Sequence, residues 1–227
     1  MKGAVTVAAF LVLVARPLPA AALEGLPTVP AGSADRLVAP HAHAMTTWFE
    51  LLAEAVPGVR RVSILVMVQP PHDHDGAAWS AIAVAARQAA RRRALHPEIM
   101  TVRHRGDLLD AFVMMTQSRI DGVVVLPTRA ALDQAAEVAA LATRHHLPLI
   151  GGHRRFVDSG ALMSYGGRGF ASRSGCTNGF VEGAKPPDAT PVGPPTRFEL
   201  LINGNTARAL DLTIPPALRL RADQIID

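Results

Sequence analysis

The middle of the chain alternates between short, unbroken apolar runs and longer amphipathic stretches. The clearest apolar run, residues 62–68 (VSILVMV), ends at a Gln-Pro-Pro sequence and is typical of a strand buried on both faces in a parallel sheet. Residues 76–95 follow with apolar positions at helical spacing, and Asp75 stands where it can cap the helix N-terminus. The pattern therefore predicts a buried strand followed by a helix that covers it.

The same alternation continues as far as residue 151. We expect strands at residues 99–103, 122–126 and 149–151, with helices at residues 107–117 and 130–145 between them. Strand–helix–strand connections of this length are right-handed, and in succession they place helices on both faces of the sheet. The predicted fold class is therefore α/β, with a doubly wound parallel sheet.

Two shorter segments complete this lobe, which we assign to residues 45–165. A short amphipathic helix from Met45 is stopped by Pro57 and Gly58. An apolar segment at residues 161–164 is expected to close one edge of the sheet.

The chain outside the lobe is less regular. Residues 23–44 are rich in proline and are expected to form an irregular arm, and residues 166–197 are rich in glycine and proline with no regular pattern. In the C-terminal part, residues 198–227, we expect a strand at 198–203 and helices at 206–210 and 215–226 that pack on the lobe.

The first 22 residues have the three parts of a secretory signal peptide. Lys2 precedes an apolar run at residues 4–14, Arg16 ends the run, and Ala20 and Ala22 form a small-x-small cleavage pattern. The run is too short for a transmembrane helix, which needs about 20 apolar residues. The sequence thus predicts an exported, periplasmic protein that is not an integral membrane protein.

Charge and composition narrow the class of partner. The 23 basic and 19 acidic residues give a net charge of +4, and the basic stretches are not interleaved with aromatic residues. Nucleic acid is therefore not expected as a partner. The single cysteine, Cys176, excludes an internal disulfide and a cysteine-based zinc cluster.

The sequence also lacks the local patterns of common catalytic sites. It contains no nucleophile elbow, no P-loop and no Gly-x-Gly-x-x-Gly motif between a strand and a helix. We therefore expect a binding protein rather than an enzyme, with no cofactor and no metal.

The candidate binding residues come from the geometry of parallel sheets, because ligands bind beyond the carboxyl ends of the strands. In that position, an arginine could meet a carboxylate and a tyrosine could stack on a ring. The predicted ligand-binding residues are Gln69, His72, Asp73, Thr128, Arg129, His153 and Tyr165.

The loop His72-Asp73-His74-Asp75 admits a second interpretation, because alternate histidines can share a metal ion when a third ligand is supplied from elsewhere. A helix N-cap with solvated histidines explains the same residues and is favoured, since no HExxH spacing accompanies them. His43 is assigned to the arm and given no role in the site.

Several segments together resemble the tryptophan/tyrosine-type family of ABC-transporter solute-binding proteins. They are residues 51–66 (LLAEAVPGVRRVSILV), 121–127 (DGVVVLP), 146–151 (HLPLIG), 156–166 (FVDSGALMSYG) and 198–227 (FELLINGNTARALDLTIPPALRLRADQIID). The resemblance implies a periplasmic-binding-protein-like fold that closes on a small solute, such as an amino acid, and delivers it to an inner-membrane ABC permease.

The sequence departs from the family pattern in two places. The resemblance implies an N-terminal lobe between the signal peptide and Met45, where only the proline-rich arm stands. Residues 166–182 replace an expected helix. These departures predict a truncated or degenerate binding protein, or one that pairs with a separately encoded lobe.

Two other functions remain as alternatives. The same architecture serves intracellular effector-binding or regulatory lobes, which would require residues 1–22 to be retained. A metal-dependent enzyme that uses the histidine-rich loop would contain stoichiometric metal.

Overall fold

The computed structural model describes residues 42–68, 76–167 and 198–227. The described chain begins with helix α2 (Ala42–Ala55) and then alternates β1 (Arg61–Met67), α3 (Gly76–Arg92), β2 (His96–Val102), α4 (Asp107–Gln117) and β3 (Gly122–Val125). It continues through α5 (Arg129–Asp133), α6 (Ala135–Arg144), β4 (Leu149–Gly151), α7 (Arg154–Asp158) and β5 (Met163–Gly167). The C-terminal part contains β6 (Phe198–Asn203), α8 (Gly204–Ala209), α9 (Pro216–Arg221) and β7 (Gln224–Ile226).

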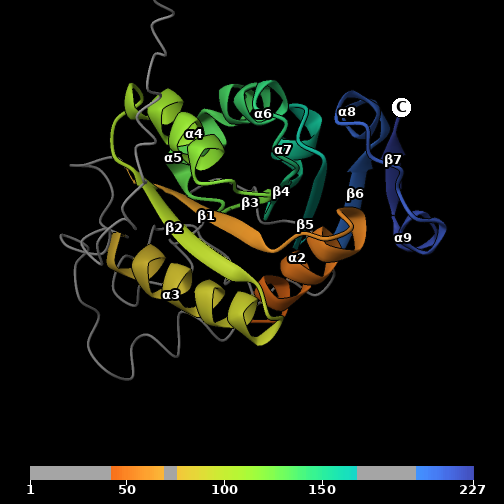
Figure 1. The fold of residues 1–227 in the computed structure, drawn as a ribbon, viewed down its shortest axis with the longest axis horizontal. Coiled ribbons are helices and arrows are strands. Elements are labelled where there is room, and N and C mark those ends of the chain that lie inside the picture. The colour runs from red at the N-terminus through yellow and green to blue at the C-terminus, as the bar shows by residue number, and fades with distance from the viewer. Residues whose placement is uncertain (1–41, 69–75, 168–197) are drawn as a thin grey trace, which may run out of the picture.

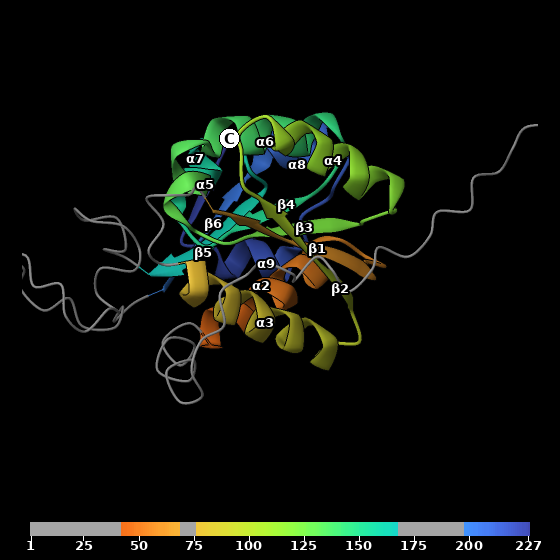
Figure 2. The same cartoon turned by 90° about the vertical axis from the view of Figure 1, so that its left-hand side faces the viewer.

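The seven strands form one sheet in the order β2-β1-β3-β4-β5-β6-β7. Strands β1 to β5 are parallel, β6 is antiparallel to β5, and β7 is parallel to β6. Helices α2 and α3 cover one face of the sheet, and α4 to α7 cover the other (Figures 1 and 2). The predicted α/β doubly wound architecture is confirmed, with a C-terminal antiparallel extension.

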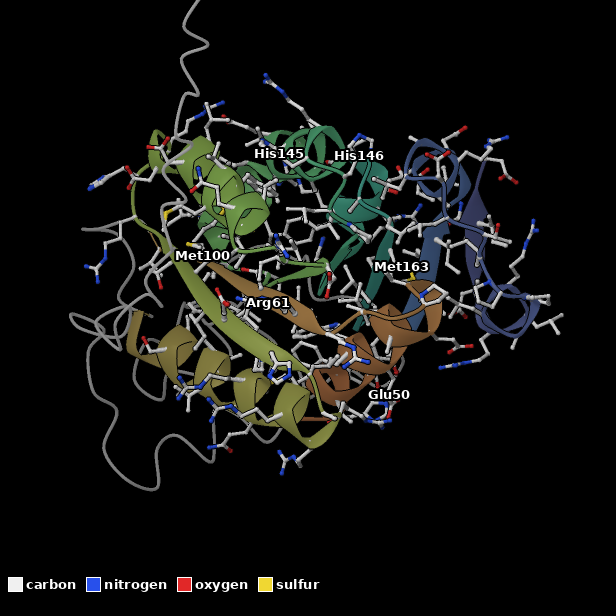
Figure 3. All side chains as sticks on the ribbon, in the orientation of Figure 1. Glu50, Arg61, Met100, His145, His146 and Met163 are labelled. Carbon is white, nitrogen blue, oxygen red and sulfur yellow. The ribbon has the colours of Figure 1, made fainter. Side chains whose placement is uncertain are left out.

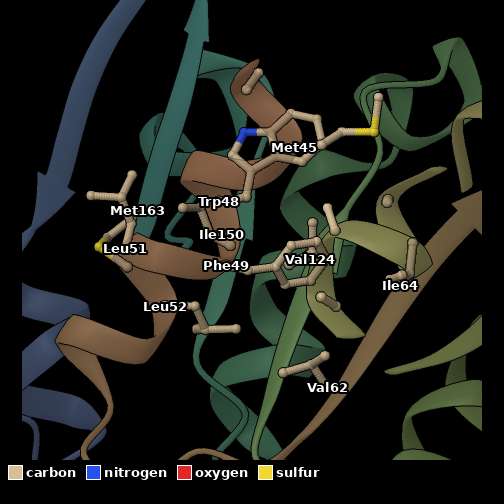
Figure 4. Packing of buried hydrophobic residues seen from close by; sticks show 14 of the residues in the cluster. Met45, Trp48, Phe49, Leu51, Leu52, Val62, Ile64, Val124, Ile150 and Met163 are labelled. Atoms are coloured by element: carbon tan, nitrogen blue, oxygen red, sulfur yellow. The ribbon is translucent and has the colours of Figure 1, made fainter. Parts of the chain in front are cut away.

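The hydrophobic core has two parts, one on each face of the sheet. On the α2 side, Trp48, Phe49 and Leu52 pack against Val124 and Ile150 of the central strands (Figure 4). Side chains of this size stabilise a fold by about 1.5–3 kcal/mol each when fully buried. Alanine and valine make up about half of the remaining core residues, in keeping with the aliphatic composition.

Ion pairs join neighbouring elements at the surface. Arg61 of β1 contacts Glu98 of β2 at 2.5 Å, and Glu50 of α2 pairs with Arg93 after α3 (Figure 3). Exposed pairs of this kind contribute little to stability, about 0–1 kcal/mol. The packing of the two core layers therefore holds the lobe together.

Three sequence-based expectations about the elements are wrong. The helix expected at residues 130–145 is two helices, separated at Gln134, whose φ of −110° and ψ of 19° are not helical. No glycine or proline marks this break. Residues 161–164 do not close an edge either, since β5 lies inside the sheet with β6 beside it.

The helix expected at residues 215–226 ends at Arg221, and its last residues form strand β7. The cause is pairing with β6. The Asp223 backbone N–H donates to the Leu200 carbonyl at 2.8 Å, and its side chain accepts from the Leu200 N–H at 2.9 Å. The pairing satisfies backbone N–H and C=O groups of β6, which would lack partners at that edge if the helix continued.

Several boundaries also differ from the prediction: β2 begins at His96 rather than at residue 99, and α3 ends at Arg92 rather than at residue 95. Helix α2 begins at Ala42, inside the segment assigned to the irregular arm, and β5 runs through Gly167, into the segment assigned as irregular. Residues 168–197 and Cys176 lie outside the described part of the chain. Among the described residues, no helix is both long and apolar enough to cross a membrane.

Candidate functional site

The order of the parallel strands selects one edge of the sheet as the candidate site. The chain adds β2 on one side of β1 and then β3 on the other side. The direction in which strands are added to the sheet therefore reverses between β1 and β3, although the two strands are parallel. In sheets of this type, ligands bind outside the carboxyl ends of the strands near such a reversal. Among the described residues, the candidate site is therefore formed by the segments that follow β3 and β4 and by the part of β5 beyond its pairing with β4. We call this site the strand-end wall.

Four of the seven predicted site residues lie in the described part of the chain: Thr128, Arg129, His153 and Tyr165. The other three, Gln69, His72 and Asp73, follow β1 and lie outside the described residues. Thr128 and Arg129 follow β3, His153 follows β4, and Tyr165 lies within β5, one residue beyond its pairing with β4.

Thr128 connects β3 to α5 and is fully buried. Its Oγ1 accepts a hydrogen bond from the Ala131 N–H at 3.1 Å, which caps the first turn of α5. A buried hydroxyl that already accepts a hydrogen bond from a helix N-terminus acts mainly as a helix cap. Thr128 thus positions the next residue, Arg129, at the start of the helix.

Arg129 is the most exposed of the four described site residues, with 73% of its side chain accessible. Its Nε lies 3.6 Å from Oδ2 of Asp133, one turn further along α5. The other oxygen of Asp133 lies 3.9 Å from Nη1 of Arg155 in α7. One carboxylate therefore stands between two guanidinium groups from neighbouring strand ends.

This arrangement leaves a surplus of positive charge on the wall, because Asp133 carries one negative charge and the two arginines carry two positive charges. Arg154 is balanced separately by Asp158, at 3.1 Å. A guanidinium group recognises a carboxylate through paired, charge-assisted hydrogen bonds. The wall is suited chemically to a small solute that bears a carboxylate.

His153 follows β4 and caps α7. Its Nδ1 accepts a hydrogen bond from the Arg155 N–H at 3.0 Å. Burial lowers the pKa of the His153 imidazole below its ordinary value of 6.5, and the positive charge of Arg155 acts in the same direction, while Asp158 opposes both. The imidazole is therefore held in its neutral form, with one nitrogen committed to the cap.

Tyr165 is half-buried near the end of β5, in a cluster of three rings that we call the His43–Tyr165–Phe198 cluster. The Tyr165 ring stacks on Phe198 with centroids 5.3 Å apart and an interplanar angle of 14°. His43 lies at the edge of both rings, and its Nε2 is 3.0 Å from the Tyr165 hydroxyl. Phe198 and His43 were both missed by the sequence-based site prediction.

The assignment of His43 to an irregular arm is wrong, since it lies in the first turn of α2. The Thr47 hydroxyl donates to the His43 carbonyl at 3.0 Å, one helical turn later. Helical spacing between these two residues was the available signal. The contact with Tyr165, 122 residues away, had no signal in the sequence.

Burial raises the pKa of the Tyr165 phenol above its ordinary value of 10.0. The hydrogen bond with Thr47 and the positive charge of Arg221 lower the pKa, and Asp223 raises it, each by less than burial does. The phenol is therefore a neutral hydrogen-bonding group over the whole physiological range.

The strand ends after β4 and β5 are in direct contact. A Cβ atom on Gly166 would overlap the carbonyl of Gly152, and one on Gly152 would lie 2.8 Å from the Trp48 ring. The Trp48 indole Nε1–H donates to the Tyr165 carbonyl at 2.7 Å. These contacts bring His153 and Tyr165 onto one wall.

The metal alternative gains no support from the described residues, which contain no group of three or more His, Cys, Asp or Glu side chains placed to hold a metal ion. The histidine-rich loop itself lies outside the described residues. His145 and His146, labelled in Figure 3, lie between α6 and the start of β4, at the opposite end of that strand from the strand-end wall.

The sheet order, the two helical layers and the strand-end wall define a periplasmic-binding-protein-like lobe. The chain belongs to the ABC transporter substrate binding protein family, because the model of that family matches residues 38–226. Proteins of this family bind small solutes and work with an ABC transporter. No curated protein matches the sequence significantly.

Solved structures show the same fold at low sequence identity. The ABC domain from Streptococcus pneumoniae in complex with L-Trp is 17% identical, with a TM-score of 0.61 over 80% of this chain and 62% of that chain. A conserved domain protein from Vibrio cholerae is 19% identical, with a TM-score of 0.60 over 80% of this chain and 60% of that one.

The ligand-free, open structure of CD0873, a substrate binding protein with adhesive properties from Clostridium difficile, is 14% identical, with a TM-score of 0.56. The match covers 78% of the present chain and 58% of the CD0873 chain. The chain thus spans about three fifths of the length of the structures it resembles.

Proposed function

We propose that the protein is the exported solute-binding component of an ABC importer and binds a small solute, such as an amino acid, on the strand-end wall. The observation that carries this proposal is the placement of Arg129 and Arg155 on either side of Asp133, with surplus positive charge where the strand order predicts a ligand. Membership of the substrate-binding family supports the same function.

The proposal includes a cellular setting and a partner. Export by the signal peptide at residues 1–22 would place the protein in the periplasm, where it would deliver its solute to an inner-membrane ABC permease. The role is binding and delivery, without catalysis. L-Trp, which is bound in the related structure from Streptococcus pneumoniae, is the first solute to test.

We further propose that the described lobe supplies one wall of the solute site. A solute contacted on one side keeps part of its surface in water and is oriented by fewer groups. Its affinity for the isolated chain is therefore expected to be lower than for a two-lobed protein that encloses its ligand.

Isothermal titration calorimetry of the purified chain with L-tryptophan, L-tyrosine, L-leucine and L-glutamate tests the proposal. Arg129→Gln should weaken binding of the preferred solute by about 10- to 100-fold, because a charged hydrogen bond is worth about 1.5–3 kcal/mol. Arg144→Gln is the matched control, since Arg144 is an exposed arginine at the end of α6.

Three outcomes separate the claims. Binding that is weakened by the Arg129 change and not by the control supports the site. Equal affinity of the Arg129→Gln and Arg144→Gln variants would mean that Arg129 is not part of the site. Absence of heat with any amino acid, confirmed by unchanged melting temperature at millimolar solute, would overturn the proposed function.

A further inference from the structure

We infer that His43 is a positioning residue of the proposed solute site, which acts on the solute through the side chain of Tyr165. The inference rests on the proposed function and adds to it a residue that lies in α2, apart from the strand ends. It is carried by the geometry of the His43–Tyr165–Phe198 cluster.

Two kinds of contact fix the Tyr165 ring. Phe198 stacks against the ring plane at 5.3 Å and 14°, which sets the tilt of the phenol. The His43 Nε2 lies 3.0 Å from the hydroxyl, which sets the direction in which the phenol points. Neither contact alone fixes both, since a stacked ring can still slide and rotate in its own plane.

The hydroxyl group of Tyr165 is held from helix α2. The His43 Nε2 and the Tyr165 hydroxyl share a hydrogen bond at 3.0 Å, in which the donor depends on the tautomer of the imidazole. One helical turn later, the Thr47 hydroxyl donates to the His43 carbonyl at 3.0 Å, which fixes the backbone that carries the imidazole.

The cluster joins three elements that are distant in the sequence. His43 comes from α2, Tyr165 from β5 and Phe198 from β6, and the end of β5 pairs with the start of β6 through Gly167 and Phe198. Trp48, the residue after Thr47, fixes the backbone of Tyr165, because its indole Nε1–H donates to the Tyr165 carbonyl. Helix α2 therefore holds both the main chain and the side chain of Tyr165.

A functional consequence follows from the exposure of these residues. Tyr165 is only half-buried, so its side chain can still contact a solute, and His43 is exposed. Without His43 the hydroxyl loses a partner and the ring gains freedom that a bound solute must remove. Positioning of this kind determines affinity because side-chain ordering opposes binding.

A double-mutant cycle distinguishes positioning from direct contact and from a purely structural role. The variants are His43→Ala, Tyr165→Phe and both together, with affinity for the preferred amino acid measured by calorimetry. His43→Ala should weaken binding about 5- to 10-fold, the equivalent of one neutral hydrogen bond. In the Tyr165→Phe background the same change should have little further effect.

Rescue and a spectroscopic signal complete the design. His43→Gln, which retains a hydrogen-bonding side chain, should recover most of the lost affinity. Tyr165 is the only tyrosine in the chain, so the alkaline absorbance change of the phenol reports this residue alone. His43→Ala should move its midpoint down toward 10, because burial is the main cause of the raised pKa. His146→Asn, at the far end of α6, is the control.

The outcomes are separable. Full additivity of the two changes would mean that His43 contacts the solute directly, and unchanged affinity in a His43→Ala variant with a lower melting temperature would mean that its role is structural. Either result overturns the inference and leaves the proposed function standing. If the unmodified chain binds no amino acid, the proposed function fails and the inference falls with it.

Discussion

Gly166 of β5 packs against the carbonyl group of Gly152 so closely that no side chain fits between them. The φ angle of Gly166 is not in the left-handed region, so its backbone conformation alone would allow other residues. Backbone approach is what requires glycine at this position. The contact sets the spacing between the two strand ends that carry His153 and Tyr165.

Gly166→Ala should therefore destabilise the protein by about 1–3 kcal/mol, the usual cost of forcing extra volume into a packed site. Urea denaturation measures this directly. Gly106→Ala is the matched control, since nothing lies within 4 Å of its Cβ position and its φ of −61° suits alanine. The control should be neutral or stabilising by up to about 1 kcal/mol. A smaller loss for Gly166→Ala than for Gly106→Ala would contradict the packing described.

Two buried hydroxyl groups should respond in opposite ways to removal. The Ser63 Oγ in β1 is fully buried without a hydrogen-bond partner, whereas the Thr128 Oγ1 caps α5. A buried hydroxyl without a partner costs about 1–3 kcal/mol, so Ser63→Ala should be neutral or stabilising. Thr128→Ala should cost about 1 kcal/mol through the lost cap. Chemical denaturation of the two variants checks the order, and a greater loss for Ser63→Ala would show that its hydroxyl has a partner.

The extent to which the sequence predicted this fold depends on where the deciding contacts lie. Residues 107–117, 149–151 and 198–203 were predicted with their exact boundaries, because apolar periodicity and flanking polar residues are local signals. The break at Gln134 was missed because no glycine or proline marks it. The strand at residues 224–226 was missed because pairing with β6 produces it, and there the backbone of Leu200 decides the conformation of Asp223.

The candidate site shows the same division. The rule of strand ends selected Thr128 and Arg129 after β3 and His153 after β4, whereas Tyr165, expected just after a strand, lies within β5, one residue beyond its pairing with β4. Arg155, two residues after His153, was not among the predicted residues, because its contact with the Asp133 carboxylate has no signal in the sequence. His43 was missed for a similar reason, since its partner is 122 residues away in the sequence.

Stability should depend on pH through His153. Its folded-state pKa lies below 6.5, so the unfolded chain binds the proton more readily, and stability falls as pH decreases through 6.5 toward the folded pKa. His153→Asn removes this titration while retaining a residue that can cap α7. The free energy of unfolding of the two proteins, measured from pH 8 to pH 5, should diverge on the acidic side, with the unmodified protein losing more. Parallel curves over the whole range would show that His153 is not held in its neutral form.

The central claim, that a small solute binds along the strand-end wall, is tested most directly by an amide NMR titration of the labelled chain with L-tryptophan and the other amino acids of the panel. The account predicts saturable shifts concentrated at Thr128, Arg129, His153 and Tyr165, with the amides of Asp121 and Leu147, at the opposite ends of the strands, unchanged. Shifts concentrated at Asp121 and Leu147, or no saturable shift with any of these solutes, would contradict it.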